Sequence, residues 1–270
     1  MTTTVTALYA RTVHGSGPGL LLAHGAGGSI EANYGPIIDG IAARHTVVGV
    51  DYPGSGDTPT AQGTLELDEL ADQLVAAADA EGLDTFAVSG YSLGGPVAIR
   101  IAARHPERVT SLVLSATFAR LDTRTELAAD VWHQLFTSGQ SRLLAQYLTQ
   151  LALSAPALNS LTPAQARAAA EQTALAVPPG TGAQVDLVRR VDVRDDLAAI
   201  TVPTLVVVTT TDSLVPATLQ QELAAAIPGA RIAELPTGHL PFVERPTEWL
   251  ELITAFLGRR TSTQGRCRRQ

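Results

Sequence analysis

The sequence predicts an α/β fold in which a doubly wound, mostly parallel sheet carries an inserted helical lid. Two observations support this class: short apolar runs alternate with amphipathic helical segments, and one long helical stretch interrupts that alternation. With 270 residues, the chain can bury one such core. We expect residues 1–117 and 200–258 to form the core, residues 118–199 the lid, and residues 259–270 a disordered basic tail.

Six short apolar runs are the candidate parallel strands, because near-continuous Val and Leu runs are typical of strands buried on both faces. They cover residues 20–23, 46–50, 86–88, 109–114, 204–208 and 231–235. Residues 5–13 precede them and are expected to form an antiparallel first strand. Helical patterns between the runs cover residues 64–81, 92–105 and 246–257.

The interrupting stretch, from Phe118 to about residue 200, is rich in Ala, Leu and Gln and is expected to form three or four helices. Thr162 followed by Pro163 marks the start of one of them, because a cap residue followed by proline favours helix initiation. A last helix is expected to run through residues 185–190. This all-helical insertion predicts a lid over the carboxyl edge of the sheet.

Composition and charge exclude several classes of function. The formal net charge of −7 argues against nucleic acid or an anionic membrane surface as a partner, which leaves a small molecule. All 19 basic residues are Arg, so chemistry that needs a lysine amine is not expected. The single Cys267 and six scattered His predict neither a metal site nor a cofactor.

Location is also predicted from composition. No apolar stretch approaches the roughly 20 residues that a membrane span needs. The opening residues, Met1 to Thr4, show neither the basic nor the apolar region of a signal peptide. We therefore expect a cytoplasmic protein, whose oligomeric state the sequence leaves open.

The segment Gly90-Tyr91-Ser92-Leu93-Gly94 lies where a strand pattern gives way to a helix pattern. Flanking glycines allow a turn that holds the serine in a strained conformation with Oγ outward, and the helix N-terminus supplies N–H groups for a developing oxyanion. A lone G-x-S-x-G arises often by chance, so the alternative is that Ser92 only caps the helix. Its position between strand and helix favours a nucleophile.

A nucleophilic serine needs a base and an orienting acid, which this pattern predicts later in the chain in the order Asp, then His. Asp212 follows the run over residues 204–208, and His239 follows the run over residues 231–235. The carboxyl ends of parallel strands lie at one edge of a sheet, so Ser92, Asp212 and His239 are expected to meet there.

A glycine-rich turn, residues 24–28, follows the first parallel run and is a candidate oxyanion hole. A phosphate cradle is the alternative interpretation, but the spacing is not G-x-G-x-x-G, and the acidic residue after the next strand is Asp51. We interpret the loop over residues 51–57 as structural, and His24 as a structural residue that hydrogen-bonds to backbone.

Over roughly residues 20–257 the chain resembles the α/β-hydrolase superfamily. The resemblance is carried by His24-Gly25-Ala26-Gly27, Asp51 to Gly56, Gly90 to Gly95, His105 to Val109, Asp212 to Pro216 and Gly238-His239. It implies that Ser92 is the nucleophile, His239 the general base and Asp212 its orienting acid. It also implies that the backbone N–H groups of Ala26 and Leu93 bind the oxyanion.

The chain departs from the family pattern in one place. Members often have a glycine shortly before the acid, where this chain has Thr209-Thr210-Thr211. Asp122, which follows the preceding strand, is therefore an alternative acid.

Residues beside the motifs, and aromatic residues of the lid, are the candidates for the wall of a substrate pocket. Trp132 and Phe136 are four apart and share a helix face, although aromatic residues at that spacing are more often core. The predicted substrate-binding residues are Gly25, Asn33, Tyr34, Tyr91, Phe118, Trp132, Phe136, Val215 and Leu240, with Tyr147 as a further lid aromatic.

The function that these features predict is a serine hydrolase cleaving a carboxylic ester or lactone of a small to medium, largely apolar substrate through an acyl-enzyme. An acyltransferase, an acyl-eliminating lyase and a carbon–carbon bond hydrolase of a catabolic or natural-product pathway are alternatives, and so is a non-catalytic small-molecule binder. Serine rather than aspartate as the nucleophile argues against dehalogenases and epoxide hydrolases. Cofactor-free haloperoxidases share the triad and stay open.

Overall fold

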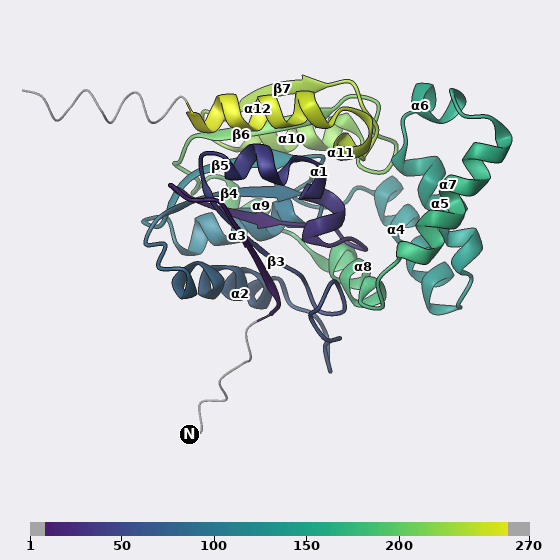
Figure 1. Cartoon of the computed structure of the whole chain (residues 1–270), viewed down its shortest axis with the longest axis horizontal. Helices are drawn as coiled ribbons and strands as arrows, with labels where there is room; N and C mark the ends of the chain where they lie inside the picture. Colours follow the sequence, from purple (N-terminus) through teal and green to yellow (C-terminus); the bar gives the residue numbers. More distant parts are fainter. Residues whose placement is uncertain (1–8, 259–270) are drawn as a thin grey trace, which may run out of the picture.

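The computed structural model describes residues 9–258, which build a seven-stranded sheet covered by helices on both faces (Figure 1). The strand order is β1-β3-β2-β4-β5-β6-β7, and every neighbouring pair is parallel except β1 with β3. The strands are β1 Arg11–His14, β2 Gly19–Ala23, β3 Thr46–Val50, β4 Phe86–Tyr91, β5 Val109–Ser115, β6 Thr204–Thr209 and β7 Arg231–Leu235. This confirms the predicted doubly wound α/β class.

The six predicted parallel strands all form, and the antiparallel first strand is confirmed at Arg11–His14. Part of that predicted strand, residues 5–8, lies outside the described residues, as does the predicted tail over residues 259–270. The largest difference is β4, which continues to Tyr91 because its pairing with β5 extends to Tyr91 opposite Ser115. The strand thus delivers the chain directly to Ser92.

Alternating side chains of the strands feed two apolar cores, one on each face of the sheet. Leu20 and Leu22 of β2 belong to one cluster, while Leu21 and Ala23 belong to the other, as expected when successive side chains point to opposite faces. One face is covered by α1 Ile30–Ala42 and α12 Pro246–Gly258, and the other by α2 Leu67–Ala80 and α3 Gly94–Arg104 (Figure 1). The remaining core helices are α10 Ala217–Ala226 and the short α11 Pro241–Glu244.

Residues 118–199 form six helices rather than the three or four expected, because two of them are too short to show a helical period. They are α4 Thr123–Thr137, α5 Ser141–Ala152, α6 Ala155–Asn159, α7 Pro163–Ala176, α8 Thr181–Arg190 and α9 Arg194–Leu197. Thr162 caps α7 as predicted, since its hydroxyl accepts from the Gln165 N–H. Figure 1 shows α4 to α7 standing beyond one edge of the sheet, whereas α8 and α9 lie closer to it.

Helix α8 packs on the core. Val185 and Leu187 of α8 are buried in the same apolar cluster as α2 and α3, so this helix is anchored to the core. None of the helices within residues 9–258 combines the length and the apolar character that crossing a membrane requires.

Candidate active site

Ser92 occupies a strained turn between β4 and α3. Its φ is 52°, in the left-handed region, a conformation that costs a non-glycine residue about 1–3 kcal/mol. Two contacts hold it there: the Ser92 N–H donates to the Ser115 carbonyl at 3.1 Å, and the Thr117 hydroxyl donates to the Ser92 carbonyl at 2.6 Å. The strained turn places Ser92 between the end of β4 and the start of α3, as the G-x-S-x-G pattern predicts.

Close packing explains the two glycines after the serine. A Cβ on Gly94 would collide with the Ala23 carbonyl of β2, and one on Gly95 would collide with the Thr117 hydroxyl. The start of α3 can therefore approach the sheet only because both positions lack a side chain.

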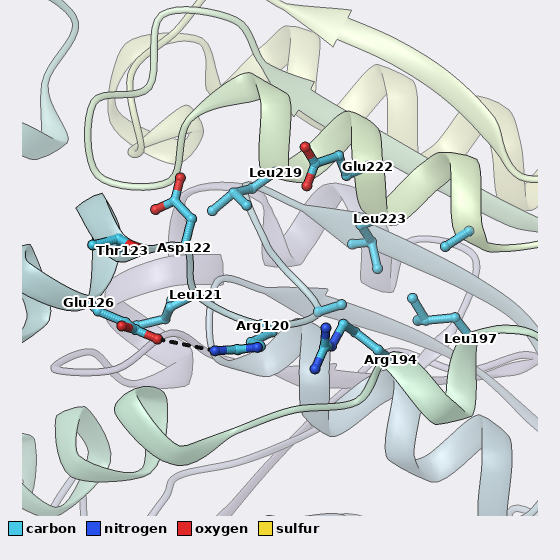
Figure 2. A pocket seen from close by; sticks show the side chains of 12 residues that line it. Arg120, Leu121, Asp122, Thr123, Glu126, Arg194, Leu197, Leu219, Glu222 and Leu223 are labelled. Carbon is cyan, nitrogen blue, oxygen red and sulfur yellow. Dashed lines mark ion pairs between the residues drawn. The ribbon is translucent and has the colours of Figure 1, made fainter.

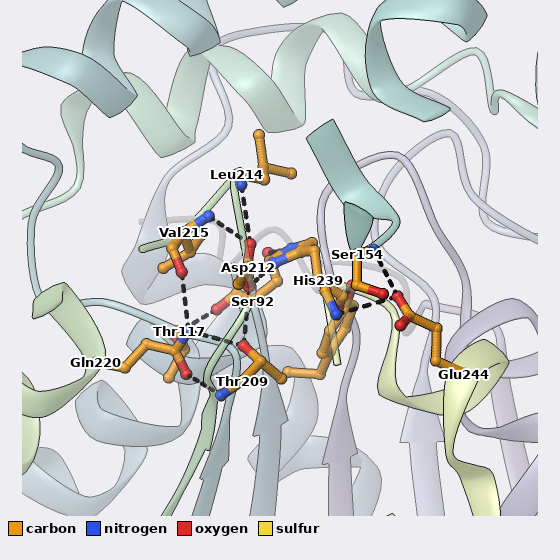
Figure 3. Close-up of polar contacts among 12 residues, drawn as sticks. Ser92, Thr117, Ser154, Thr209, Asp212, Leu214, Val215, Gln220, His239 and Glu244 are labelled. Atoms are coloured by element: carbon orange, nitrogen blue, oxygen red, sulfur yellow. Dashed lines mark hydrogen bonds and ion pairs between the residues drawn. The ribbon is translucent and has the colours of Figure 1, made fainter. Parts of the chain in front are cut away.

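Ser92, His239 and Asp212 form one hydrogen-bonded chain at the carboxyl edge of the sheet (Figure 3). His239 Nε2 lies 3.0 Å from Ser92 Oγ, and His239 Nδ1 lies 2.8 Å from Asp212 Oδ2. All three side chains are buried, and they follow β4, β6 and β7. With Nδ1 donating to the carboxylate, the lone pair of Nε2 faces the serine hydroxyl and can take its proton.

Asp212 is held by a complete set of donors (Figure 3). Its Oδ1 accepts from the Leu214 and Val215 N–H groups at 2.9 and 2.8 Å, and its Oδ2 accepts from the Thr209 hydroxyl at 2.9 Å. Gln220 Nε2 donates to the same Thr209 oxygen at 2.8 Å, which leaves the hydroxyl hydrogen free to turn toward Asp212. Thr209, the first of the three threonines at which the chain departs from the family pattern, thus fixes the position of the Asp212 carboxylate.

The alternative acid, Asp122, has a different place in the fold. It is the N-cap of α4, where its Oδ1 accepts from the Thr125 N–H at 2.8 Å and the Thr125 hydroxyl at 2.7 Å. The hydroxyl of Thr125 holds the pKa of this carboxyl below its ordinary value. Since His239 Nδ1 faces Asp212, the prediction of Asp122 as an alternative acid is wrong.

The loop that carries His239 is hydrogen-bonded to the lid. The His239 N–H donates to the Ala152 carbonyl at 2.7 Å, and Glu244 Oε1 accepts from the Gly238 and Ser154 N–H groups at 3.0 and 2.9 Å (Figure 3). The Tyr91 hydroxyl donates to the His239 carbonyl at 2.9 Å, and burial raises the pKa of Tyr91 well above its ordinary value, so it stays a donor. Nothing in the sequence pattern indicated Glu244.

The glycine-rich turn commits most of its N–H groups to fixed acceptors. The Gly25 N–H donates to Asn33 Oδ1 at 3.0 Å, the Gly27 N–H to Gln184 Oε1 at 2.8 Å, and the Gly28 N–H to the Gly25 carbonyl at 3.2 Å. Within residues 9–258, the Ala26 N–H has no acceptor, and neither has the N–H of Leu93, the N-cap of α3. These are the two groups that the resemblance implies as oxyanion donors.

His24 and Asp51 are structural, as predicted. His24 Nε2 accepts from the Tyr52 N–H at 2.9 Å, and its Nδ1 lies 2.8 Å from the Gly25 carbonyl. Complete burial lowers the pKa of His24 to about 4, so the ring is neutral near pH 7. Asp51 Oδ1 accepts from the Ile30 N–H at 2.7 Å and so fixes the start of α1; burial raises the pKa of Asp51.

A cavity of about 460 Å³ opens onto Ser92 and His239. Its wall contains no Asp, Glu, Arg or Lys among the described residues, and much of it comes from the lid helices. Asn33, Tyr91, Trp132 and Leu240 line it, as predicted for the pocket. The sequence did not indicate the other lid residues, which are Leu148, Thr149, Ala152, Leu153, Ala169, Gln172 and Thr173.

Several predicted pocket residues lie elsewhere, so those predictions are wrong for this cavity. Tyr34 is fully buried in the apolar cluster that also holds Trp249, where it donates to the Ser89 carbonyl at 3.0 Å. Phe118 is buried in the apolar cluster that also holds α2 and α3. Tyr147 donates its hydroxyl to the Ala128 carbonyl.

The remaining corrections concern close packing. Phe136 packs against Gly182 of α8, where a Cβ would lie 2.9 Å from the ring. Val215 supplies its N–H to Asp212, and Gly25 lies so close to Tyr91 and Ser92 that a side chain would not fit. None of the three lines the cavity.

Another cavity, of about 390 Å³, lies between the start of α4 and α10 (Figure 2). Its lining contains charges of both signs: Arg120 lies 3.7 Å from Glu126, and Arg194, Asp122 and Glu222 also line it. Its lining contains no serine, cysteine or histidine, whereas the cavity at Ser92 is lined by the hydrogen-bonded pair Ser92 and His239 and is therefore the candidate active site. Within residues 9–258, no group of His, Cys, Asp or Glu side chains is arranged to hold a metal ion.

Comparison with known proteins decides the family. A model of the alpha/beta hydrolase fold matches residues 18–246. The chain belongs to the α/β-hydrolase family.

Named relatives of this α/β-hydrolase are hydrolases. It is 33% identical over 247 residues to pyrrolizixenacetamide deacetylase of Xenorhabdus hominickii, covering 91% of this chain and 92% of that protein. It is 32% identical over 257 residues to pimeloyl-[acyl-carrier protein] methyl ester esterase of Aeromonas hydrophila, covering 90% of this chain and 97% of that protein. The α/β-hydrolase described here is thus an enzyme.

A solved structure shows the same fold. The enol-lactonase from Burkholderia xenovorans LB400 superposes with a TM-score of 0.81 at 21% sequence identity, covering 92% of this chain and 96% of that one. At this identity the likeness concerns the fold alone.

Proposed function

We propose that this α/β-hydrolase is a serine hydrolase that cleaves a carboxylic ester or lactone through an acyl-enzyme. The observation that carries the proposal is the chain from Ser92 Oγ through His239 to Asp212, with distances of 3.0 and 2.8 Å, at an uncharged cavity of about 460 Å³. The esterase and deacetylase among its relatives support acyl-group hydrolysis.

The reaction follows from the roles of the three side chains. His239 Nε2 takes the Ser92 proton while Oγ attacks the carbonyl carbon, and Asp212 stabilises the resulting imidazolium. The carbonyl oxygen becomes an oxyanion that accepts hydrogen bonds from the Ala26 and Leu93 N–H groups. His239 then protonates the departing alcohol, which leaves Ser92 acylated.

Deacylation repeats these steps with water. His239 takes a proton from the water as its oxygen attacks the acyl carbon, and it returns that proton to Ser92 Oγ when the ester bond breaks. The products are the carboxylic acid and the alcohol, or the hydroxy acid where the substrate is a lactone.

The cavity supports a neutral, largely apolar substrate of small to medium size. A charged acyl or alcohol group would lose its hydration there without meeting an opposite charge, which is costly. The polar side chains that line it, such as Asn33, Thr149 and Gln172, are uncharged. We therefore expect esters and lactones with uncharged acyl chains to be better substrates than esters that carry a free carboxylate.

The first test is active-site labelling of the full chain. Intact mass spectrometry after treatment with a fluorophosphonate should show one adduct on the wild type, and none on Ser92→Ala or His239→Ala. The absence of an adduct on a folded wild type, or equal labelling of Ser92→Ala, would overturn the proposal and favour a small-molecule binder.

Product analysis then separates hydrolysis from the other reactions of an acylated serine. A panel of p-nitrophenyl esters, lactones and an N-acetyl amide should give free acid as the main product. Transfer of the acyl group to an added alcohol in preference to water would instead indicate an acyltransferase.

A further inference from the structure

Gln184 links the lid to the turn that holds the Ala26 N–H. It lies on α8, is fully buried, and its Oε1 accepts from the Gly27 N–H at 2.8 Å. Its Nε2 donates to the Pro53 carbonyl at 3.2 Å and to Ser55 Oγ at 2.9 Å. A single amide thus binds the loops that follow β2 and β3 to the same helix.

The orientation of this amide is determined by its partners. Gly27 N–H is a donor and needs an acceptor, whereas the Pro53 carbonyl is an acceptor and needs a donor. Only the arrangement with Oε1 toward Gly27 satisfies both. Because Gln184 is fully buried and satisfies all three partners together, replacing its amide with an apolar group would leave buried polar groups unpaired.

The contact acts next to the implied oxyanion donor. Asn33 holds the Gly25 N–H from α1 on one side, and Gln184 holds the Gly27 N–H from α8 on the other. Ala26 lies between these two fixed peptides, so the direction of its N–H is set by both contacts. Gly27 has a φ of 70°, and Trp132 of α4 lies against it, which leaves the turn little room to move without the lid.

We propose that Gln184 is a positioning residue that aims the Ala26 N–H at the oxyanion, so that the oxyanion hole is complete only when α8 is seated on the core. It acts through Gly27 and touches no reacting atom. The proposal rests on the proposed function for its catalytic consequence, whereas its structural part, the fixing of the turn, does not.

Three variants separate this role from a purely structural one. Gln184→Met keeps the length and loses every hydrogen bond. Gln184→Asn keeps an amide that is too short to reach, and it serves if the Met variant fails to fold. Ser55→Ala is the matched control, because it removes one partner of Gln184 and leaves the Gly27 contact intact.

The kinetic readout is turnover per active site, with the sites counted by fluorophosphonate labelling. Loss of one oxyanion donor lowers kcat by about 10²–10³-fold, so we expect a misaimed donor in Gln184→Met to lower it by about 10–10²-fold with little change in KM. A trifluoromethyl ketone, which forms an oxyanion on Ser92, should lose affinity in parallel. Ser55→Ala should stay within about twofold of the wild type. Unchanged kcat per labelled site in Gln184→Met would overturn the proposal.

A second readout needs no turnover. Hydrogen–deuterium exchange of a peptide covering residues 24–28 in the full chain should speed up in Gln184→Met and stay unchanged in Ser55→Ala. Equal exchange in both variants would overturn the proposal even if labelling had already disproved the serine hydrolase. Failed labelling of the wild type together with faster exchange in Gln184→Met would disprove the proposed function but support the inference that Gln184 fixes the turn over residues 24–28.

Discussion

Thr209 donates its hydroxyl to Asp212 Oδ2 at 2.9 Å, the same carboxylate oxygen that lies 2.8 Å from His239 Nδ1. The Thr209 hydroxyl and His239 Nδ1 therefore both bond to the same oxygen of Asp212, and their directions fix the plane of the carboxylate. Gln220 holds the Thr209 hydroxyl from α10. Thr209, at the end of β6, thus orients the carboxylate of Asp212, the acid of the proposed triad.

Thr209→Val should lower kcat by about 3–10-fold with KM unchanged, because the lost hydrogen bond is worth about 1 kcal/mol and the carboxylate loses part of its orientation. Thr209→Ser keeps the hydroxyl and should restore most of the activity. Steady-state kinetics with a p-nitrophenyl ester measure both. For scale, Asp212→Asn should cost up to about 10⁴-fold. Equal activity of the Val and Ser variants would show that the hydroxyl does not position the acid.

Asp122 provides the contrasting case of a carboxylate that caps a helix. Asp122→Ala should reduce the free energy of unfolding by about 1 kcal/mol, because the Thr125 N–H at the start of α4 loses its acceptor. Turnover per labelled site should stay within about twofold of the wild type. Urea unfolding and active-site titration measure the two effects. A large loss of kcat would show that Asp122 takes part in the active site.

Much of the site could be predicted because each of its motifs is local. Ser92, Asp212 and His239 each lie shortly after the end of a strand. Parallel strands bring their carboxyl ends to one edge of the sheet, so the order of elements is enough to predict that the three residues meet. The run Thr209-Thr210-Thr211 departs from the family pattern, but the hydroxyl contact of Thr209 depends on its side-chain rotamer, which no pattern specifies.

The residues that the sequence did not indicate make contacts across long separations. Gln184 lies 157 positions from Gly27, and Glu244 lies 90 positions from Ser154. Such pairs depend on how the lid docks, and a single sequence has no period or motif that reports it. Part of the predicted pocket wall was wrong because side-chain direction was not predicted. Asn33 and Tyr34 are adjacent, but successive helix positions point about 100° apart, so Asn33 lines the cavity and Tyr34 enters the core.

Glu244 ties the His239 loop to the lid, and its removal should affect turnover more than folding. Glu244→Ala leaves the Gly238 and Ser154 N–H groups without their shared acceptor, so we expect kcat to fall by about 10-fold as His239 loses its alignment. Glu244→Gln retains Oε1 as an acceptor and should keep most of the activity. Kinetics per labelled site, with Tm as the folding control, distinguish these outcomes. A fall in Tm without a change in kcat would assign Glu244 to stability alone.

The buried His24 should make stability depend on pH. Its pKa in the folded protein is about 4, below the ordinary value of 6.5, because burial penalises the charged ring. Between these two pH values the unfolded chain binds a proton that the folded protein does not. The stabilisation is therefore present in full above about pH 6.5 and is lost as the pH falls toward 4, by up to about 3 kcal/mol. Urea unfolding of the wild type from pH 7.5 to 4.5 measures the slope.

The variant His24→Asn isolates this contribution from that of other titrating groups. It should be less stable than the wild type at pH 7, since the Tyr52 N–H loses its acceptor, and the difference should shrink as the pH falls below 6.5 because only the wild type loses stability through this ring. His45→Asn is the matched control: burial also lowers the pKa of His45, but that side chain is only partly buried, so its curve should stay closer to parallel with the wild type. A constant difference between wild type and His24→Asn across this range would mean that His24 titrates alike in the folded and unfolded states, and that its ring is not held neutral by the core.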